Sequence, residues 1–293
     1  MRTGLALLAA ALAATGLVAL PGVAQAGPAT TYYVSVGDSY SVGYQPGLGA
    51  TTGYAGYVAK KTGLTLANFG CGGATTTSII DTVGCPDVLP HTAGAHLYPT
   101  TTQAAAAEAF ITAHRGHIGL ITVSIGGNDV TACAAQASPI PCVATAVVSI
   151  DENVRTLATG LRAAAGPRVP LIGLTYPDVL LGAYVYPTQP ATALRLALAS
   201  TSVVAFKSLI NPALAKAYAA AGGAFVDVTA ATGAYTPLTT TATVAPYGTI
   251  PRAVAQVCTL TWYCADGNIH ATGTGYAFIG RLVASRYATL RRR

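Results

Sequence analysis

Along the chain, short apolar runs alternate with longer stretches in which apolar residues recur at helical spacing. Five runs rich in β-branched and aliphatic residues predict strands at residues 32–36, 64–69, 118–125, 169–175 and 224–228. The run at 118–125 is almost entirely apolar, which is typical of a strand buried on both faces of a parallel sheet.

Amphipathic stretches between these runs predict helices. Ser149 and Glu152 form a capping-box pattern that predicts a helix start, and the Gly-Pro pair at 166–167 predicts its end. Pro190 suits the first turn of a helix that reaches about residue 209, and apolar residues at helical spacing over 276–287 predict the last helix. Strands separated by helices indicate an α/β fold, a parallel sheet covered by helices on both faces.

The N-terminal residues 1–26 have the pattern of a signal peptide. Arg2 precedes an apolar stretch at 4–20, a Pro-Gly break follows, and Ala24-Gln25-Ala26 matches the small-x-small cleavage pattern. An uncleaved anchor helix is the alternative, although 17 residues are short for a span. We expect cleavage after Ala26, secretion, and a protein that is not inserted in the membrane.

The remaining residues, 27–293, contain no internal repeat and no linker, which predicts one domain. Hydrophobic residues make up 52% of the chain and charged residues 9%, a balance that excludes a disordered protein. Of the net charge of +6, three charges lie at the terminal residues 291–293 and one at Arg2, which argues against a nucleic-acid-binding surface. The longest irregular stretch, 229–267, is expected to form a lid or rim.

All six cysteines follow the leader, as expected for disulfides in an exported chain. Six cysteines allow 15 pairings, but these lie in three groups that are local in sequence. We therefore expect the pairs Cys71–Cys85, Cys133–Cys142 and Cys258–Cys264, which would pin loops. No C-x-x-C spacing supports a zinc site, and neither a metal nor an organic cofactor is expected.

Four loops that follow strands or precede the last helix carry the residues suited to chemistry. Gly37-Asp38-Ser39 follows the first strand, Gly72-Gly73 lies just after the second, and Asn128-Asp129 follows the third. Asp266-Gly267-Asn268-Ile269-His270 precedes the last helix. In a parallel sheet, ligands bind outside the carboxyl ends of the strands, so we expect these loops to converge there.

These residue types meet the needs of acyl transfer. A serine hydroxyl such as that of Ser39 is a poor nucleophile until a base takes its proton, and His270 can be that base. The tetrahedral intermediate needs hydrogen-bond donors aimed at its oxyanion. The backbone N–H groups of Ser39 and Gly73 and the side-chain amide of Asn128 can supply three. Asp38 and Asp129 are expected to bond backbone N–H groups in tight turns.

The four segments, in this order, resemble the signature blocks of the SGNH, or GDSL, hydrolase family, and in detail the secreted esterases and lipases of actinobacteria. The resemblance spans nearly all of residues 27–293. It implies a three-layer α/β/α flavodoxin-like fold with five parallel strands. By matching position it makes Ser39 the nucleophile, His270 the base, and Ser39, Gly73 and Asn128 the oxyanion hole. No GxSxG motif is present, which argues against an ordinary α/β-hydrolase.

One position departs from the family pattern. The family places an acid three residues before the histidine, where this chain has Gly267, and Asp266 lies four before His270. We favour Asp266 as the residue that orients His270, because a carboxylate also stabilises the imidazolium. The alternatives are a Ser–His dyad oriented by the Gly267 carbonyl and, more remotely, Asp227.

The substrate is expected to be a small-molecule or lipid ester. The apolar and aromatic stretch 175–187 follows the fourth strand and suits an acyl chain, although ordinary loop packing explains it equally well. Carboxylic esters with lipidic or short acyl groups are favoured over sugar esters because the chain has a single Trp and few charges. The rival interpretations are a carbohydrate O-acetylesterase and a non-catalytic binding protein. We expect a monomer without nucleic-acid partners.

Overall fold

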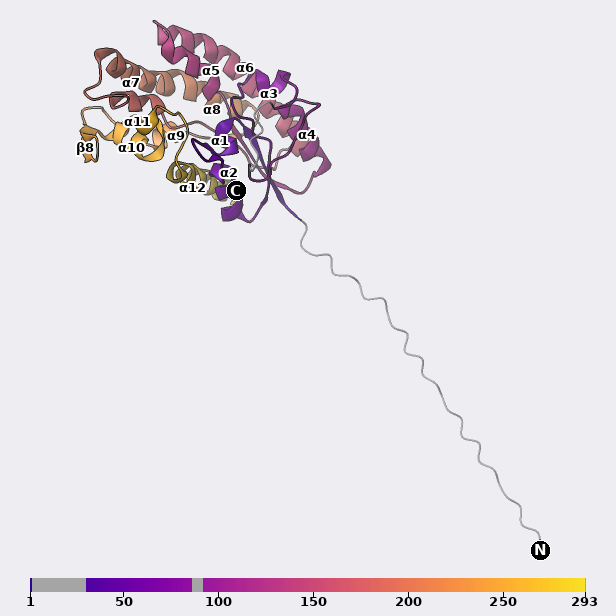
Figure 1. The fold of residues 1–293 in the computed structure, drawn as a ribbon. Helices are drawn as coiled ribbons and strands as arrows, with labels where there is room; N and C mark the ends of the chain where they lie inside the picture. The colour runs from indigo at the N-terminus through magenta and orange to yellow at the C-terminus, as the bar shows by residue number, and fades with distance from the viewer. Residues whose placement is uncertain (2–29, 86–91, 293) are drawn as a thin grey trace.

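The computed structural model describes residue 1, residues 30–85 and residues 92–292; the expected leader lies outside them. Five parallel strands form a central sheet with helices around it (Figure 1). The order of the strands is β4-β1-β5-β6-β7. Their bounds are β1 Tyr32–Gly37, β4 Thr65–Asn68, β5 Ile118–Ser124, β6 Leu171–Leu174 and β7 Ala224–Val226. All five predicted strands are therefore present.

This strand order is flavodoxin-like, because the second strand of the sheet along the chain lies on one side of β1 and the later three lie on the other. The order reverses between β1 and β5, which is where the loops after neighbouring strands diverge and leave a crevice. In the register, Val36 of β1 lies beside Val123 of β5 and Gly37 beside Ser124. The two central strands thus end together.

Helices α4 (Gln103–Ala113), α6 (Pro139–Ala165) and α8 (Asn211–Ala220) cover one face of the sheet. Their buried side chains pack with strand residues in one core that includes Val34, Ile121 and Leu157. Gly173 of β6 lies under the fully buried ring of Tyr218 on α8. The ring fits there because glycine has no side chain to collide with it.

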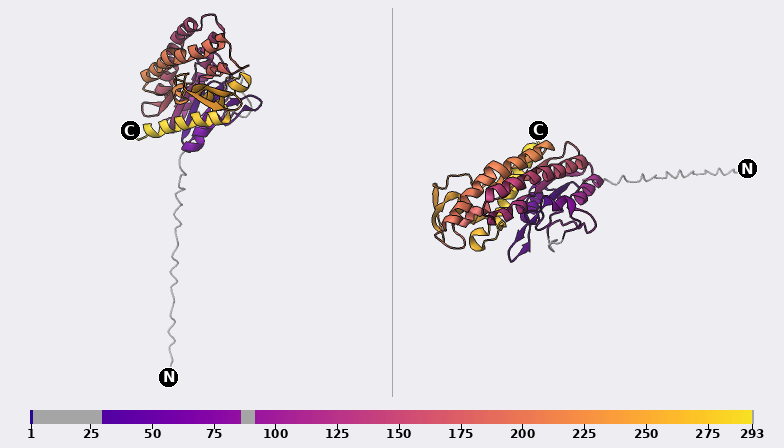
Figure 2. Two further views of the ribbon diagram at one scale, coloured as in Figure 1. Left: turned by 90° about the vertical axis from the view of Figure 1, so that its left-hand side faces the viewer. Right: turned by 90° about the horizontal axis from the view of Figure 1, so that it is seen from above.

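Helices α2 (Gly53–Thr62) and α12 (Gly273–Leu290) cover the other face, so that three layers result (Figure 2). The core on this side is rich in tyrosine. Tyr33 and Tyr54 are fully buried, and their hydroxyls bond Thr122 at 2.7 Å and Ser124 at 3.2 Å. These bonds satisfy polar groups that burial would otherwise penalise.

One continuous helical stretch consists of α7 (Ala193–Ala205), a π-helical turn η3 (Phe206–Ile210) and α8. Ala193–Ala220 is the single helix among the described residues that is long and apolar enough to cross a membrane by length and composition. In the domain its second half packs on the sheet, where Leu214 and Tyr218 are fully buried.

Three helix and loop expectations were wrong. Helix α6 begins at Pro139, ten residues before the capping-box pattern, because a proline suits the first turn and Ser149 continues the helix. Helix α7 begins after the N-cap Thr192, which accepts from the Arg195 N–H, rather than at Pro190. The stretch 229–267 is not irregular: it contains a β-hairpin and helices that pack around a third small core.

The elements of that stretch are α9 (Val228–Ala231), β8 (Thr241–Val244), β9 (Gly248–Pro251), α10 (Arg252–Leu260) and α11 (Tyr263–Asp266). The remaining short elements are α1 (Ser39–Val42), β2 (Tyr44–Gln45), β3 (Gly49–Ala50), α3 (Ser78–Asp81), α5 (Gly127–Thr131), η1 (Ala132–Ala135) and η2 (Val179–Tyr184). Most of these short elements lie in the loops beyond the carboxyl ends of the strands, where they shape the candidate site.

Gly173→Ala should destabilise the domain by about 1–3 kcal/mol, because the new methyl group would overlap the immobile Tyr218 ring. The measurement is the urea unfolding midpoint with the disulfides oxidised. Gly273→Ala is the matched control, since a Cβ there meets no atom within 4 Å. Equal midpoints for the two variants would contradict the packing argument.

Candidate active site

The candidate site lies at the crevice where the strand order reverses. Ser39 follows β1 as the first residue of α1, and Asn128 follows β5 in α5. Asp38 is the N-cap of α1, and its carboxylate accepts from the Tyr40 N–H at 2.9 Å. The N–H of Ser39, at the first helical position, has no acceptor within the helix and can donate to a ligand.

Ser39 and His270 are in direct contact. The Ser39 Oγ and the His270 Nε2 lie 2.8 Å apart, although 231 residues separate them. Ser39 is buried to 9% exposure and His270 is partly buried. The sequence predicts that these two residues act as a pair, and the structure brings them together.

The side chain of Asn268 is the partner of the other imidazole nitrogen. Its Oδ1 lies 2.7 Å from His270 Nδ1 and also accepts from the His270 backbone N–H at 3.0 Å. A backbone N–H can only donate, so the atom facing it must be the amide oxygen. The same oxygen then requires a proton on Nδ1. This leaves Nε2 free to accept the Ser39 hydroxyl proton, which is the tautomer a general base needs.

Neither expected orienting group contacts the imidazole. Asp266 is exposed at the end of α11, and its Oδ1 accepts from the Asn268 N–H at 2.9 Å. Asn268 then makes the same turn with His270, so that two successive Asx turns replace the expected acid and the Gly267 carbonyl. Asp227 lies elsewhere, where it caps α9 and bonds Asn211.

The sequence analysis missed Asn268. An Asn two residues before the histidine is a signal for an Asx turn, and that signal could have identified it. Asp266 keeps an indirect part, because it fixes the backbone of Asn268.

Burial controls the protonation of His270. Desolvation lowers the pKa of His270 to about 4, so the imidazole is neutral at pH 7. Tyr44 packs edge-on against the ring at 4.5 Å between centroids. Tyr40, next to the nucleophile, donates its hydroxyl to the Ile269 carbonyl at 2.7 Å. Tyr44 thus covers part of the ring, and Tyr40 holds the backbone next to His270.

Asp38 holds the turn that carries Ser39 through two hydrogen bonds. Besides capping α1, its carboxylate accepts the Tyr176 hydroxyl at 2.6 Å. Burial raises the pKa of Asp38 to about 7. The bond from the Tyr40 N–H is the backbone contact expected from the sequence, whereas the bond from the Tyr176 hydroxyl was not expected.

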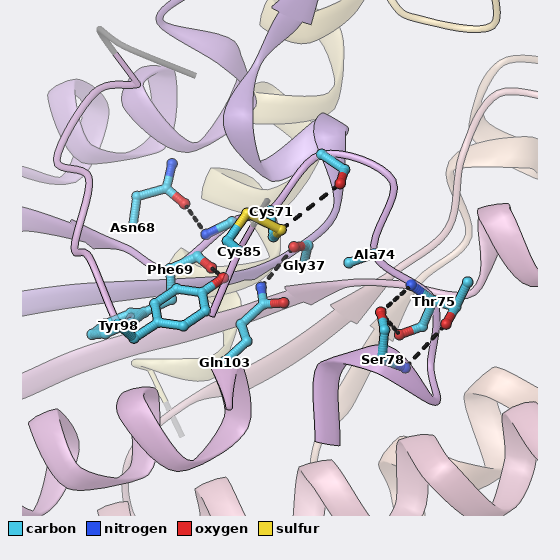
Figure 3. Close-up of a disulfide and its surroundings, with 12 residues drawn as sticks. Gly37, Asn68, Phe69, Cys71, Ala74, Thr75, Ser78, Cys85, Tyr98 and Gln103 are labelled. Carbon is cyan, nitrogen blue, oxygen red and sulfur yellow. Dashed lines mark hydrogen bonds between the residues drawn. A yellow bond between two sulfur atoms is a disulfide. The ribbon is translucent and has the colours of Figure 1, made fainter. Parts of the chain in front are cut away.

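The Gly73 loop is fixed to the end of β1 (Figure 3). Cys71 donates its N–H to the Gly37 carbonyl at 2.9 Å, and Gln103 donates to the same carbonyl at 2.7 Å. The disulfide Cys71–Cys85 ties this loop to the segment after α3. Gly73 itself has φ +72° in the turn that the Ala74 N–H to Cys71 carbonyl bond closes, a conformation that favours glycine.

Two side chains join that loop to α5. Asn128 donates one amide N–H to the Ala74 carbonyl at 2.8 Å, which leaves its second N–H for an oxyanion. The Asp129 carboxylate accepts from the Thr76 N–H at 3.0 Å and from the Thr76 hydroxyl. Gly73 and Asn128, two of the three predicted donors, are thus held on loops that these hydrogen bonds connect.

The three disulfides have the expected pairing, Cys71–Cys85, Cys133–Cys142 and Cys258–Cys264. Each follows or precedes one of the site loops. The third joins α10 to α11, and the backbone beside it pairs with the His270 segment through the bond from the Trp262 N–H to the His270 carbonyl, 3.0 Å. Across 30–85 and 92–292, no group of His, Cys, Asp or Glu side chains could hold a metal ion.

A small cavity that opens to solvent lies over Ser39 and Asn128. Four residues of the stretch 175–187, which the sequence analysis associated with an acyl chain, line it: Tyr176, Pro177, Val179 and Leu180. Val130 and Phe206 also line it and were not anticipated. Gly73 is not part of its wall.

A three-layer α/β/α domain with a serine and a histidine in contact at its strand-order reversal defines an SGNH-type hydrolase fold. A sequence model of the GDSL-like Lipase/Acylhydrolase family matches residues 35–278. The chain belongs to this family.

Among solved structures, an extracellular lipase from Streptomyces rimosus matches over 88% of this chain and 100% of its own, with 20% identity and a TM-score of 0.51, which is a likeness of fold. The salicylyl-acyltransferase SsfX3 from a tetracycline biosynthetic pathway matches 78% of this chain and 52% of its own, with 13% identity and a TM-score of 0.32. A comparison with curated proteins returned no match.

An NMR titration should find His270 neutral at pH 6, with a pKa of about 4 because of its burial. The variant His270→Asn assigns the signal. Asn268→Asp should raise the pKa of His270, because a carboxylate beside Nδ1 favours the imidazolium, while Asn268→Ala tests the contact without adding charge. A His270 pKa that does not respond to Asn268→Asp would contradict the contact.

Proposed function

We propose that the protein is a secreted serine hydrolase that cleaves carboxylic esters through an acyl-enzyme on Ser39. The observation that carries the proposal is the chain of hydrogen bonds from Ser39 Oγ to His270 Nε2 and from His270 Nδ1 to Asn268 Oδ1. It supplies a nucleophile, a base in the required tautomer and a group that holds the base in place.

In the first half-reaction, Ser39 Oγ attacks the ester carbonyl carbon and its proton passes to His270 Nε2. The carbonyl π electrons move to oxygen, which would accept hydrogen bonds from the N–H groups of Ser39 and Gly73 and from the Asn128 amide. Collapse of the tetrahedral intermediate breaks the carbon–oxygen bond to the alcohol. The alcohol leaves with the proton from His270, and the acyl group stays on Ser39.

In the second half-reaction, water gives one proton to His270 and its oxygen attacks the acyl carbon. Collapse releases the carboxylic acid and returns the proton to Ser39 Oγ. Asn268 accepts the Nδ1–H throughout and prevents the imidazole from turning. A neutral amide orients the ring without compensating the charge that His270 acquires in each transition state.

Secretion is part of the proposal. It is supported by the signal-peptide pattern at residues 1–26, by three disulfides, which persist in oxidising compartments, and by the fold that the chain shares with an extracellular lipase. A lipidic or short-acyl ester is proposed as substrate because the cavity over Ser39 is lined mainly by apolar side chains.

Ser39→Ala should lower kcat/KM for p-nitrophenyl esters at least 1000-fold, because the acyl-enzyme cannot form. Asn128→Ala should cost about 100- to 1000-fold, the usual loss for one oxyanion donor. A fluorophosphonate probe should label the wild type and not Ser39→Ala. Folded wild type without turnover or labelling would favour a non-catalytic binding protein, and turnover limited to acetylated sugars would favour a carbohydrate O-acetylesterase.

In the Asp38→Asn variant, the pH profile of kcat/KM should remain flat as the pH falls from 7 to about 5, and should decline only as His270 protonates near its lowered pKa of about 4. An ordinary histidine would lose activity from about pH 6.5. Asp38, with a pKa raised to about 7, is a second titrating group in the site. Asp38→Asn removes its contribution, so a decline near pH 6.5 that persists in this variant would contradict the assignment.

A further inference from the structure

A groove lined by cations lies between helices α2 and α12, on the outside of the layer that these two helices form. Its volume is about 680 Å³. Lys61 lines it from α2 and Arg281 from α12. Arg291 and Arg292, which directly follow α12 near the C-terminus marked in Figure 2, line its end. All four residues are exposed, so this cationic groove presents four positive charges to solvent.

No acidic side chain balances the charges of the cationic groove. Neither α2 nor α12 contains an aspartate or a glutamate, and none lines the groove. Within residues 30–85 and 92–292, both ion pairs are made by Asp151 of α6, so the four cations have no ion-pair partner there. A concave surface with charges of one sign attracts oppositely charged groups from solution and concentrates them.

The length of the cationic groove favours a chain over a single small anion. Its floor on α12 consists of small residues, Ala284, Ser285 and Ala288. Arg281 precedes them and Arg291 follows them, so the two arginines stand at opposite ends of the floor. At 1.5 Å per residue these ends are about 15 Å apart. One phosphate can contact only one of the two arginines, whereas a chain of phosphates can contact both.

Two of the guanidinium groups are held against aromatic rings. Arg281 lies over the Phe278 ring at 6.0 Å from its centroid, and Arg291 lies over the Tyr287 ring at 5.7 Å. Such contacts leave the N–H donors of the guanidinium free. Each of these arginines can therefore donate two parallel hydrogen bonds to the oxygens of a phosphate.

The cationic groove leads away from the candidate active site. Arg291 also lines a neighbouring hollow together with Thr31, Leu64 and Pro170, which directly precede β1, β4 and β6. This end of the groove therefore lies at the amino edge of the sheet. Ser39 follows the carboxyl end of β1, about 20 Å away along that six-residue strand at 3.3 Å per residue. A ligand in the groove would leave the site uncovered.

We propose that the cationic groove binds a linear polymer that carries a phosphate in each repeat, and that it holds the protein on this polymer with the candidate active site open to solvent. The four uncompensated cations supply the attraction, and their spacing along α12 requires a chain. A flat bilayer would reach only the rims of a groove between two helices, whereas a chain can enter it. The inference does not depend on the proposed reaction at Ser39.

The test is the binding of the wild type to fluorescently labelled long-chain inorganic polyphosphate, followed by anisotropy at 50 and 200 mM salt. Each phosphate contact on a single-stranded polyanion adds about 0.7 to the slope of log Kd against log salt. Four contacts therefore predict that binding weakens about 50-fold between the two salt concentrations. The absence of binding at 50 mM salt would overturn the proposal.

Two variants of equal net charge separate the groove from the overall charge of the protein. The first neutralises the groove and should abolish binding: Lys61→Gln, Arg281→Gln, Arg291→Gln and Arg292→Gln together. The second neutralises four exposed cations elsewhere and should keep the wild-type affinity: Arg155→Gln, Lys207→Gln, Lys216→Gln and Arg252→Gln together. Equal losses in the two variants would overturn the groove as the binding site.

A smaller variant gives a second, graded measurement. Arg291→Gln with Arg292→Gln changes only residues beyond the end of α12, and should reduce the effect of salt from about 50-fold to about sevenfold, since two contacts remain. It replaces the fourfold groove variant in the comparison if that variant loses its circular dichroism signal. An unchanged salt dependence would overturn the proposal.

Other occupants and the open site are tested with the same variants. Phosphatidylglycerol vesicles that bind the wild type when polyphosphate does not would overturn the polymer in favour of a bilayer. Single-stranded DNA that binds more tightly than polyphosphate at equal phosphate concentration would overturn it in favour of a nucleic acid. Saturating polyphosphate should leave the rate of Ser39 labelling by a fluorophosphonate unchanged, and protection from the probe would contradict the open site. A wild type that binds polyphosphate but neither reacts with the probe nor cleaves an ester would remove the proposed function and leave this inference standing.

Discussion

The contact between Ser39 Oγ and His270 Nε2 is the constraint on which the rest of the site depends, because it joins positions 231 residues apart within 2.8 Å. Each end is fixed separately. The β1–α1 turn and its cap, Asp38, hold the serine. The histidine is held by Asn268, and its backbone by the Tyr40 hydroxyl on Ile269. Tyr40 follows Ser39 in the chain, so this hydrogen bond joins the turn that carries Ser39 directly to the loop that carries His270. Helix α12 begins directly after the His270 loop, so the packing of α12 against α2 stabilises the domain and also fixes the position of that loop.

Loops beyond the ends of a sheet have few ladder bonds to hold them, and here covalent crosslinks compensate. The disulfides close short segments with sequence separations of 14, 9 and 6 residues. In the chain-entropy model, loops of this size contribute about 2–3 kcal/mol each. Their positions matter more than that sum. One lies beside the Gly73 turn, one directly after the Asn128 helix, and one beside the His270 segment. Each crosslink therefore restrains one loop next to a candidate site residue.

The sequence predicted the strands and the edge of the sheet at which the site lies, because buried parallel strands leave uninterrupted apolar runs and their carboxyl ends must meet. It failed where the outcome depends on tertiary contacts. The capping-box pattern at Ser149 is compatible with a helix interior, and nothing local shows that α6 already began at Pro139. Phe206 lines the cavity at the start of a π-helical turn, and the periodicity of the sequence predicts neither. The partner of His270 was misassigned because a carboxylate was expected, whereas the two Asx turns bring the Asn268 amide to Nδ1.

The use of an amide in place of a carboxylate has consequences for the proposed reaction. A carboxylate beside Nδ1 would favour the imidazolium and strengthen the base, whereas Asn268 only fixes its direction and tautomer. Burial lowers the pKa of His270 to about 4, and no carboxylate beside Nδ1 raises it. The imidazole is therefore a weak base that is neutral at any pH above that value. The transfer of the Ser39 proton is then uphill by more than in a carboxylate triad. In the proposed reaction the remaining stabilisation would come from the oxyanion donors, and Asn128 and the Gly73 turn are bonded to each other and to the end of β1.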